Sequence, residues 1–523
     1  MRQPALLKQP RNARRKISRS KSVPAPTGGW NARDNIAMMA ETDAIKLDDA
    51  FPRTSDVLLR KGYSQHVTGL SDQVQSLMAY NEPDGSQTLF CAEGTDFFDV
   101  TSAGAVGAAV VSSLTNAKWF HINFTNSSSV SYLCCFNGVD SPRYWNGSSW
   151  ITVTGVSSPA ITGVTPTLLT KPWVHKRRVW VIEKDSLSAW YLPVDAVGGA
   201  AAELDMSGLF KRGGYLVAGG TWTIDGGEGL DDYWVAMTSE GEVAVYRGTD
   251  PSSGSTWSLV GVWYIGSPIG DRPFKQWASE LLVITEGGVY PMARALQSSQ
   301  VSHETAITYK IQEAISSATN TYRSNYGWEI EIFPDADMLI LNVPVSDGSN
   351  QEQYVMNTIT GAWGRFTGIS ANCWALFNGV PYFGSNTYVG KFWQDLDDNG
   401  ADIEADIKQA FNYFGDRGSI KQWKMARPIL AANGIPAVLA SLNVDYEDEE
   451  PFSDVSFSPI PGAVWDTAVW DTGQWNTDFY SLKSWQTVNG VGTAAALRLK
   501  IKAQGISTRF QATDYVFEPG EVI

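Results

Sequence analysis

The chain has 523 residues, of which 43% are hydrophobic and 18% charged, so it has enough apolar surface to fold as a globular protein. Its formal net charge is −15, and the first 24 residues contribute +8, so the rest of the chain carries −23. An acidic body excludes non-specific adsorption to nucleic acid, because that binding requires cations that displace counterions from phosphate. No run approaches the roughly 20 apolar residues of a membrane-spanning helix, and we expect no membrane span.

Residues 1–27 are basic and rich in serine, and they end in a segment that contains Pro24 and Pro26. Such a segment buries little surface, so we expect a flexible arm. The arm is either solvated or becomes ordered on an assembly partner or on DNA phosphates. Residues 28–71 are predicted to form an extended N-terminal segment.

Residues 72–399 repeat a theme of two β-rich runs separated by a polar turn and closed by aromatic residues. One example runs from Trp374 to Phe377, turns at Asn378-Gly379, and continues to Phe383. Asn and Gly supply the positive φ of tight turns, so the theme predicts hairpins. At roughly 40 to 50 residues per unit, it predicts an all-β, irregular β-propeller of about six to eight blades. A β-sandwich or a solenoid would show the same local pattern.

Two features depart from this repeat. The stretch 306–315 places Ile307, Ile311, Ala314 and Ile315 on one helical face and predicts a short amphipathic helix. From residue 400 onward the hairpin theme gives way to longer β-rich runs. We therefore assign residues 400–523 to a β-rich C-terminal assembly domain.

The sequence shows no arrangement that indicates catalysis. A GxSxG elbow, a phosphate-binding loop and a dinucleotide fingerprint are missing, and the four histidines are scattered along the chain. The four cysteines have neither zinc spacing nor a disulfide framework. We therefore expect a protein that is not an enzyme and uses no cofactor. A propeller hydrolase or lyase with acids gathered on one rim is an open alternative.

One acidic stretch resembles a calcium loop. Asp395, Asp397, Asn399 and Asp406 fall at positions 1, 3, 5 and 12 of the 12-residue pattern. Position 12 is Asp where the pattern has Glu, and the apolar Ile403 stands at position 9. The stretch is therefore a weak metal candidate, and a simple turn between two strands is the main alternative.

A second acidic run consists of Asp445, Glu447, Asp448, Glu449 and Glu450. Its simplest interpretation is a solvated loop. If the run faced a central channel, its carboxylates would repel DNA phosphates, and these five residues are our candidates for lining a channel.

Four tryptophans near the C-terminus, Trp465, Trp470, Trp475 and Trp485, recur at intervals of five, five and ten residues. Aromatic rings at this density either stack on sugars or pack into an interface between subunits or domains. We favour the interface and take these residues as interface candidates.

Several separated blocks resemble the tail protein family of podoviruses, the short-tailed bacteriophages. The blocks are Gly29–Met39, Lys61–Tyr63, Ile340–Pro344, Tyr354–Phe366, Ala410–Gly415, Lys421, Arg427-Pro428 and Ala512–Pro519. They are spread over almost the whole chain beyond residue 28. The basic arm and the tryptophan repeat are departures from the pattern of that family.

The resemblance implies a structural virion protein of the tail nozzle, tail hub or packaged-DNA stabilisation class. It implies a homo-oligomeric ring, expected to hold six copies, assembled in the host cytoplasm. Its partners would be the adaptor and portal complex, tail fibres or spikes, needle or plug proteins, and genomic DNA that passes without specific contacts. The alternative within a tail is a receptor-binding or glycan-binding propeller.

Overall fold

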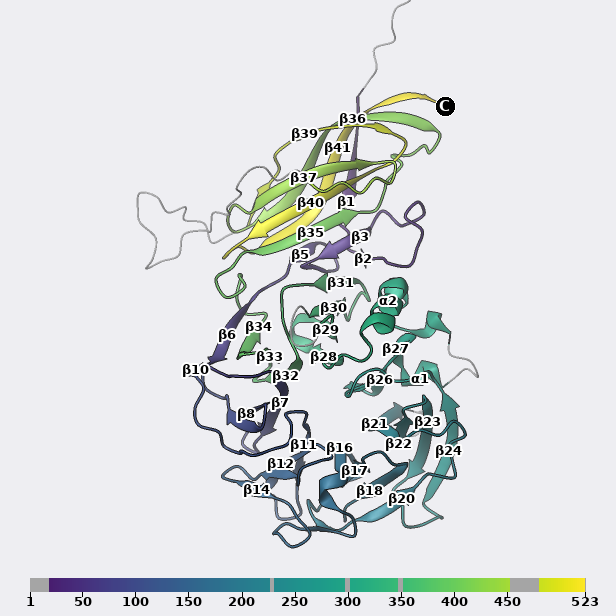
Figure 1. Cartoon of the computed structure of the whole chain (residues 1–523). Coiled ribbons are helices and arrows are strands. Elements are labelled where there is room, and N and C mark those ends of the chain that lie inside the picture. The colour runs from purple at the N-terminus through teal and green to yellow at the C-terminus, as the bar shows by residue number, and fades with distance from the viewer. Residues whose placement is uncertain (1–17, 226–229, 297–301, 347–350, 452–478, 523) are drawn as a thin grey trace, which may run out of the picture.

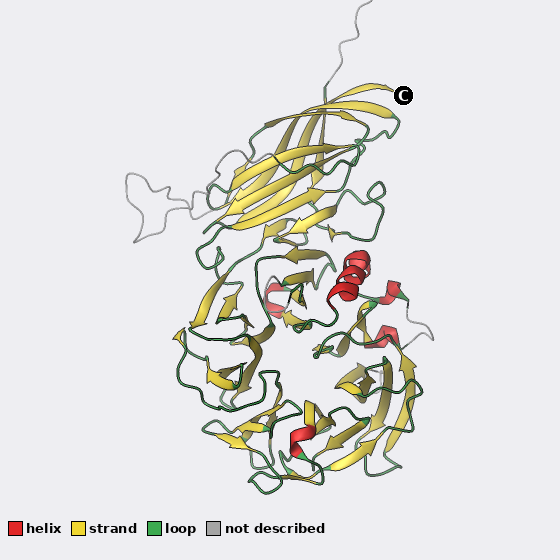
Figure 2. Ribbon diagram, viewed as in Figure 1, coloured by secondary structure: helices red, strands yellow, loops and turns green. Residues whose placement is uncertain are grey.

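The computed structural model describes residues 18–225, 230–296, 302–346, 351–451 and 479–522. Figure 1 shows two parts: a ring of small sheets, and an elongated β-sandwich that adjoins the ring at one side. Strands dominate both parts, and the few helices lie on the ring (Figure 2).

The ring is a β-propeller with seven blades within the described residues, each blade a small sheet. The innermost strands follow one another around the axis, and β32 packs against β7 to close the ring. These strands are β7 (Val74–Asn81), β11 (Phe120–Thr125), β16 (Leu169–His175), β21 (Leu216–Asp225), β25 (Phe274–Trp277), β28 (Glu329–Phe333) and β32 (Cys373–Phe377).

Each blade runs outward from its innermost strand through antiparallel neighbours. In blade order these are β8 (Gln87–Glu93) and β9 (Asp96–Asp99); β12 (Ser131–Phe136), β13 (Arg143–Trp145) and β14 (Trp150–Thr152); β17 (Arg178–Glu183), β18 (Ser188–Tyr191) and β20 (Ala202–Asp205); β22 (Leu230–Thr238), β23 (Glu242–Gly248) and β24 (Trp257–Tyr264); β26 (Glu280–Thr285) and β27 (Gly288–Pro291); β29 (Met338–Val343), β30 (Glu352–Asn357) and β31 (Trp363–Phe366); and β33 (Val380–Gly384), β34 (Tyr388–Phe392) and β6 (Tyr63–Thr68). Two short parallel pairs join β10 (Gly104–Ala105) to β6 and β15 (Ile161–Thr162) to β19 (Gly199–Ala200).

The last blade takes its outermost strand from the N-terminal segment. Strand β6 pairs antiparallel with β34, so residues far apart in sequence close the propeller. Blade 7 also contains the predicted hairpin. Phe377 pairs with Val380 across Asn378 (φ 50°) and Gly379 (φ 73°), two positive φ values that a tight hairpin turn requires.

Alternation along the strands explains how the blades stack. All six residues of β29 are buried. Leu339 and Leu341 enter one hydrophobic core, whereas Met338 and Ile340 enter the core on the other face of the blade. Because successive strand residues point to opposite faces, an unbroken apolar run buries both faces of a blade between its neighbours.

The sandwich combines strands from both ends of the chain. Its first sheet contains β38 (Tyr480–Leu482), β36 (Ser419–Ala432), β41 (Thr508–Val522), β5 (Val57–Leu59) and β4 (Ala50–Pro52), with β1 (Arg19–Pro24) paired to β41 and β39 (Gln486–Gly492) paired to β36. The core between the sheets includes Trp423, Leu497, Leu499, Tyr515 and Phe517.

The second sheet of the sandwich continues from blade 6 of the propeller. Beyond β31 it runs through β3 (Asp43–Asp48), β35 (Ile403–Gln409), β40 (Ala495–Ala503) and β37 (Ala437–Val444), and β2 (Gly29–Trp30) pairs with β3. One sheet is therefore shared by the two parts, which joins them through backbone hydrogen bonds.

The helical elements are short and lie beside blades 3, 5 and 6. They are α1 (Met292–Ala295), α2 (Gln312–Tyr322) and the 3-10 turns η1 (Pro166–Leu168), η2 (His303–Thr305), η3 (Tyr309–Ile311) and η4 (Pro334–Ala336). Among the described residues, none of these helices is long and apolar enough to cross a membrane.

The fold class predicted from the sequence, a β-propeller with a β-rich C-terminal domain, is confirmed, but the bounds of several elements differ. The predicted helix at 306–315 is instead α2, which begins at Gln312. The backbone N–H of Ile307 donates to Val289 at 2.9 Å, and its carbonyl accepts from the Trp363 indole at 3.1 Å. These bonds hold the first residues of the prediction outside a helix.

The N-terminal boundaries also need correction. Part of the predicted arm, Arg19–Pro24, is strand β1 in the sandwich, because each of its residues pairs with β41. Residues 1–17 lie outside the described part of the chain. The predicted extended segment at 28–71 supplies strands to the sandwich and β6 to the propeller.

Candidate functional site

Two water-accessible cavities lie along the propeller axis. One, of about 490 Å³, is lined by innermost strands of all seven blades, and we call it the axial cavity. The other, of about 550 Å³, lies where innermost strands begin, and we call it the entry cavity. The two cavities share the lining residues Phe120, Lys171, Val217 and Asp271.

Arg272 joins several blades at the wall of the axial cavity. Its guanidinium donates to Ser76 Oγ at 3.0 Å and to the Trp119 carbonyl at 3.1 Å, and it lies 3.4 Å from Glu329 Oε2. Burial raises the pKa of Glu329, and the charge of Arg272 opposes that rise. Since its bonds go to the protein itself, this pair acts as a structural link between blades.

Further around the wall, Lys275 and Glu331 form an ion pair of 2.7 Å. His121 faces the same cavity and makes no hydrogen bond to a described residue. Burial, together with the charges of Arg272 and Lys275, lowers the pKa of His121 to about 4. His121 is therefore neutral at neutral pH and adds no charge to the cavity.

Lys171 stands where the two cavities meet, in a distorted part of β16. The strand pairing shifts register between Thr170 and Trp173, and Lys171 has φ 50° directly before Pro172. Such bulges re-aim a side chain that a regular strand would point elsewhere. Within the described residues, Lys171 Nζ forms no hydrogen bond or ion pair, and its nearest aromatic neighbour is Phe120, with a ring centroid 5.5 Å away.

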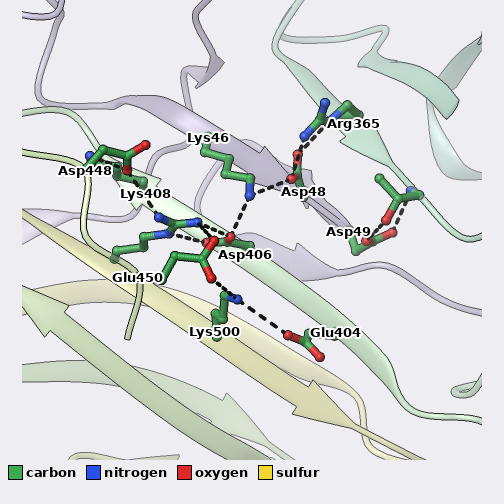
Figure 3. Close-up of polar contacts among 12 residues, drawn as sticks. Lys46, Asp48, Asp49, Arg365, Glu404, Asp406, Lys408, Asp448, Glu450 and Lys500 are labelled. Carbon is green, nitrogen blue, oxygen red and sulfur yellow. Dashed lines mark hydrogen bonds and ion pairs between the residues drawn. The ribbon is translucent and has the colours of Figure 1, made fainter. Parts of the chain in front are cut away.

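The acidic run of the C-terminal domain lies outside the ring, against the sheet of the sandwich (Figure 3). Asp448 and Glu450 are 73% and 61% exposed, yet they contact buried cations. Asp448 lies 2.8 Å from Lys408, and Glu450 lies 2.9 Å from both Arg498 and Lys500. A hydrogen bond from Lys408 lowers the pKa of Asp448, and one from Lys500 lowers that of Glu450.

Asp445, Glu447 and Glu449 are held by hydrogen bonds that involve backbone groups. Asp445 Oδ1 accepts from the backbone N–H groups of Thr493 and Ala494, at 2.8 and 3.1 Å. The carbonyls of Glu447 and Glu449 accept from Lys408 and Asn443, both at 2.9 Å. The predicted free acidic surface is thus partly neutralised by the sheet, and whether the run lines a channel in an assembly stays a prediction.

The ion pairs continue across four strands toward the propeller (Figure 3). Asp406 lies at their centre, with Lys46 at 2.6 Å and Arg498 at 2.7 Å. Asp48 links Lys46, at 3.3 Å, to Arg365 of blade 6, at 2.7 Å. Burial opposes ionisation of Asp406, but hydrogen bonds from Arg498 and Lys46 outweigh it and lower the pKa. The network therefore stabilises the shared sheet at the junction of the two parts.

The calcium-loop candidates do not converge on one point. Asp406 forms ion pairs with Lys46 and Arg498 of the sheet. Asp397 Oδ1 instead accepts from the Gly400 backbone N–H at 2.7 Å and closes a turn. Asn399 Oδ1 accepts from the Gln65 N–H at 3.3 Å, and Asp395 lies nearby with one buried, unpaired oxygen. In the described part of the chain, no three His, Cys, Asp or Glu side chains are grouped to hold a metal ion.

Of the four tryptophans proposed for an interface, Trp465, Trp470 and Trp475 lie outside the described residues. Trp485 precedes β39 and is 40% exposed. The guanidinium of Arg427 lies 4.6 Å from the centroid of its ring. One face of this ring is thus covered by the chain itself.

Sequence reasoning missed the cavity residues and the ion network. Lys171, His121 and Arg272 come from three different blades, and no local motif joins them. A Lys-Pro pair inside a β-rich run was the one local signal, because proline inside a strand marks an edge or a bulge.

The strand pairing defines this chain as a seven-bladed β-propeller, within the described residues, with an appended β-sandwich. A scan against protein-family models and a search of curated proteins find no match. Among solved structures, the chain is similar to BBS1N in complex with ARL6DN (14% identity, TM-score 0.27) and to Raptor of Chaetomium thermophilum (11% identity, TM-score 0.40). The matches cover 42% and 64% of this chain but span only 61% and 29% of those chains.

Proposed function

We propose that this chain is a structural protein of a short-tailed bacteriophage virion, a subunit of the tail nozzle or hub that forms a ring-shaped conduit and gate for genome DNA. The proposal does not assign it catalysis. The observation that carries it is the placement of the sequence blocks that resemble the podovirus tail family.

Blocks that are distant in sequence contact one another at the sandwich and blade 6. Trp30 packs edge-on against Tyr354, with centroids 5.3 Å apart. Gly29 has φ 82°, and a Cβ there would lie 2.5 Å from the Trp363 carbonyl, so only glycine fits. These contacts bring the first block together with the block at 354–366.

Three further blocks meet inside the sandwich. Phe414 packs against Tyr515 and Phe517, with centroid distances of 5.0 and 5.2 Å. Arg427 forms an ion pair with Asp514 on the neighbouring strand. The blocks that resemble the tail family therefore make the contacts that build this part of the fold, which is the support we take for a common architecture.

Charge supports the conduit. With −23 outside the first 24 residues, a ring of such bodies is negative overall, so its net charge repels a passing phosphate backbone. In a closed ring each subunit contacts its neighbours through two different patches. We propose six copies, docked on the adaptor and portal complex, with fibres or spikes and a needle or plug as further partners.

The test is assembly of the full chain. Mass photometry and negative-stain electron microscopy of the purified protein, alone and with the adaptor and portal complex, are expected to show rings. Monomers under all these conditions would contradict the proposal. In assembled virions, a labelled subunit away from the tail axis would also contradict it.

The same purified protein also tests the alternative function, a receptor-binding or glycan-binding propeller of the tail. A glycan array with wild-type protein and Trp470→Ala distinguishes sugar binding from assembly. Ring formation lost in Trp470→Ala without any sugar binding by the wild type supports the nozzle or hub. Specific sugar binding that Trp470→Ala abolishes supports a receptor-binding propeller.

A further inference from the structure

The entry cavity carries a surplus of positive charge inside an acidic protein. Four cationic side chains, Lys118, Lys171, Lys184 and Arg323, and the two carboxylates Asp185 and Asp271 line it. The formal surplus is two positive charges. In a body with a net charge of −23 outside its first 24 residues, such a surplus gathered at one cavity needs an explanation.

Most of these cations are not neutralised inside the cavity. Lys118 lies over the ring of Tyr326, 4.6 Å from its centroid, and is not part of an ion pair among the described residues. Arg323 reaches Glu286 at 3.8 Å, but both side chains are about half exposed, so this contact is weak. The positive charge is therefore available to a ligand.

Lys171 is the strongest single indication of a ligand. It lies deep in the ring, with Asp271 and Arg272 as charged neighbours, and its ammonium group has no hydrogen-bond acceptor among the described residues. Burial lowers its pKa, and the charge of Asp271 opposes that effect. Lys171 is partly buried, so its ammonium group loses part of its hydration, and within the described residues only the Phe120 ring, 5.5 Å away, faces it in return.

The backbone places this side chain there at a further cost. Lys171 has φ 50°, a conformation that residues other than glycine rarely adopt, and it precedes a proline, which restricts it further. Strain of this kind gathers at sites where a side chain must point in one direction. The bulge between Thr170 and Trp173 directs Lys171 to the junction of the two cavities.

We propose that the entry cavity binds a small ligand that carries a phosphate dianion, with the partly buried Lys171 as its main contact and Lys118 as a second contact on the wall. Near neutral pH a phosphate monoester carries a charge of about −1.5 to −2, which matches the formal surplus of the cavity. Lysine binds phosphate as a point charge, and such charge-assisted hydrogen bonds are stronger than neutral ones. Asn116, which also lines the cavity, offers an additional donor through its side-chain amide.

The experiment is isothermal titration calorimetry of the full chain in a phosphate-free buffer. The probes are inorganic phosphate, adenosine monophosphate and a short single-stranded oligonucleotide with a 5′-terminal phosphate. Saturable binding of inorganic phosphate or of the monophosphate is expected, and Lys171→Met is expected to weaken it by about tenfold or more. Lys118→Met, a change at a less strained position, is expected to weaken it by a smaller factor.

Lys424→Met is the matched control, because it removes the same charge from strand β36 of the sandwich, away from both cavities. Circular dichroism of each variant checks that it is folded. If Lys171→Met does not fold, the proposal is tested by comparing the phosphate affinity of Lys118→Met with that of Lys424→Met.

The three probes also separate the sources of the phosphate group. Tighter binding of the monophosphate than of the oligonucleotide indicates that the ligand is a free small molecule. The reverse order indicates a nucleic-acid end. Either result supports the site when Lys171→Met or Lys118→Met weakens binding. Two results would overturn the proposal. One is that neither inorganic phosphate nor the monophosphate binds the wild type, and the other is that the cavity variants and Lys424→Met bind equally well.

Discussion

Arg60 offers the sharpest test of how the N-terminal segment is held to the propeller. Its side chain is 2% exposed and joins Asp49 at 2.5 Å to Asp398 at 2.6 Å. It also donates to the Thr367 carbonyl at 3.1 Å. Arg60→Met keeps much of the volume but leaves two carboxylates, 5% and 14% exposed, without their cation.

The magnitude follows from the burial. Removing one partner of a buried ion pair costs about 3 to 5 kcal/mol, because the remaining charge stays desolvated. Asp49 keeps two hydrogen bonds from Thr367, at 2.9 and 2.6 Å, which reduces the penalty for that residue. We therefore expect Arg60→Met to lower the free energy of unfolding by about 4 kcal/mol at pH 7.

The loss is expected to depend on pH. Burial already raises the pKa of Asp49, and Arg60 opposes that rise, so removing Arg60 raises the pKa further. A carboxyl group with a raised pKa becomes neutral as the pH falls, and the neutral form is cheaper to bury. The difference between wild type and Arg60→Met is thus expected to shrink as the pH is lowered from 7 toward 5.

The assay is urea unfolding followed by tryptophan fluorescence and circular dichroism, with each transition fitted separately because the chain has two parts. The control is Arg177→Met, which breaks the pair with Asp195, where the arginine side chain is 76% exposed. Such a pair is worth less than about 1 kcal/mol. Equal, small effects of the two substitutions would refute the buried-ion argument.

Four further results are expected. The pKa of His121 is lowered to about 4, so the free energy of unfolding is expected to fall as the pH drops from about 6.5 toward 4. Denaturant unfolding measured across that pH range is expected to show a shallower fall for His121→Gln than for the wild type. Asp406 has a lowered pKa, so its contribution is present above about pH 4 and lost below it, and acid unfolding of Asp406→Asn should depend less on pH there. Added calcium is expected to leave the thermal midpoint unchanged, since Asp406 is bound to Lys46 and Arg498; a concentration-dependent rise would contradict this. Trp485→Ala is expected to cost less than about 1 kcal/mol in the monomer but to weaken ring assembly, measured by mass photometry.

The fold class could be predicted because its signal is local. Each hairpin is indicated by a polar turn between two apolar runs, as at Asn378-Gly379. The blade count could not be fixed in the same way. Blades 1 and 5 have three strands within the described residues, and blade 7 borrows β6 from residues 63–68. Pairing between distant strands cannot be recognised from the sequence of either strand alone.

The site was harder to predict for the same reason. Asp448 and Glu450 look like a solvated run until Lys408 and Arg498 are placed beneath them by two other strands. Lys171 is one lysine among many in the sequence. Its isolation becomes visible only when the innermost strands surround it.

Pairing between the two ends of the chain constrains how the protein can be synthesised. Strand β1 needs β41, and β6 needs β34, so residues that leave the ribosome first must wait for partners that leave it much later. Until residues 508–522 emerge, β1 is an open edge that other nascent chains can join. A ribosome that stops before β41 therefore releases a product in which β1 lacks its partner strand.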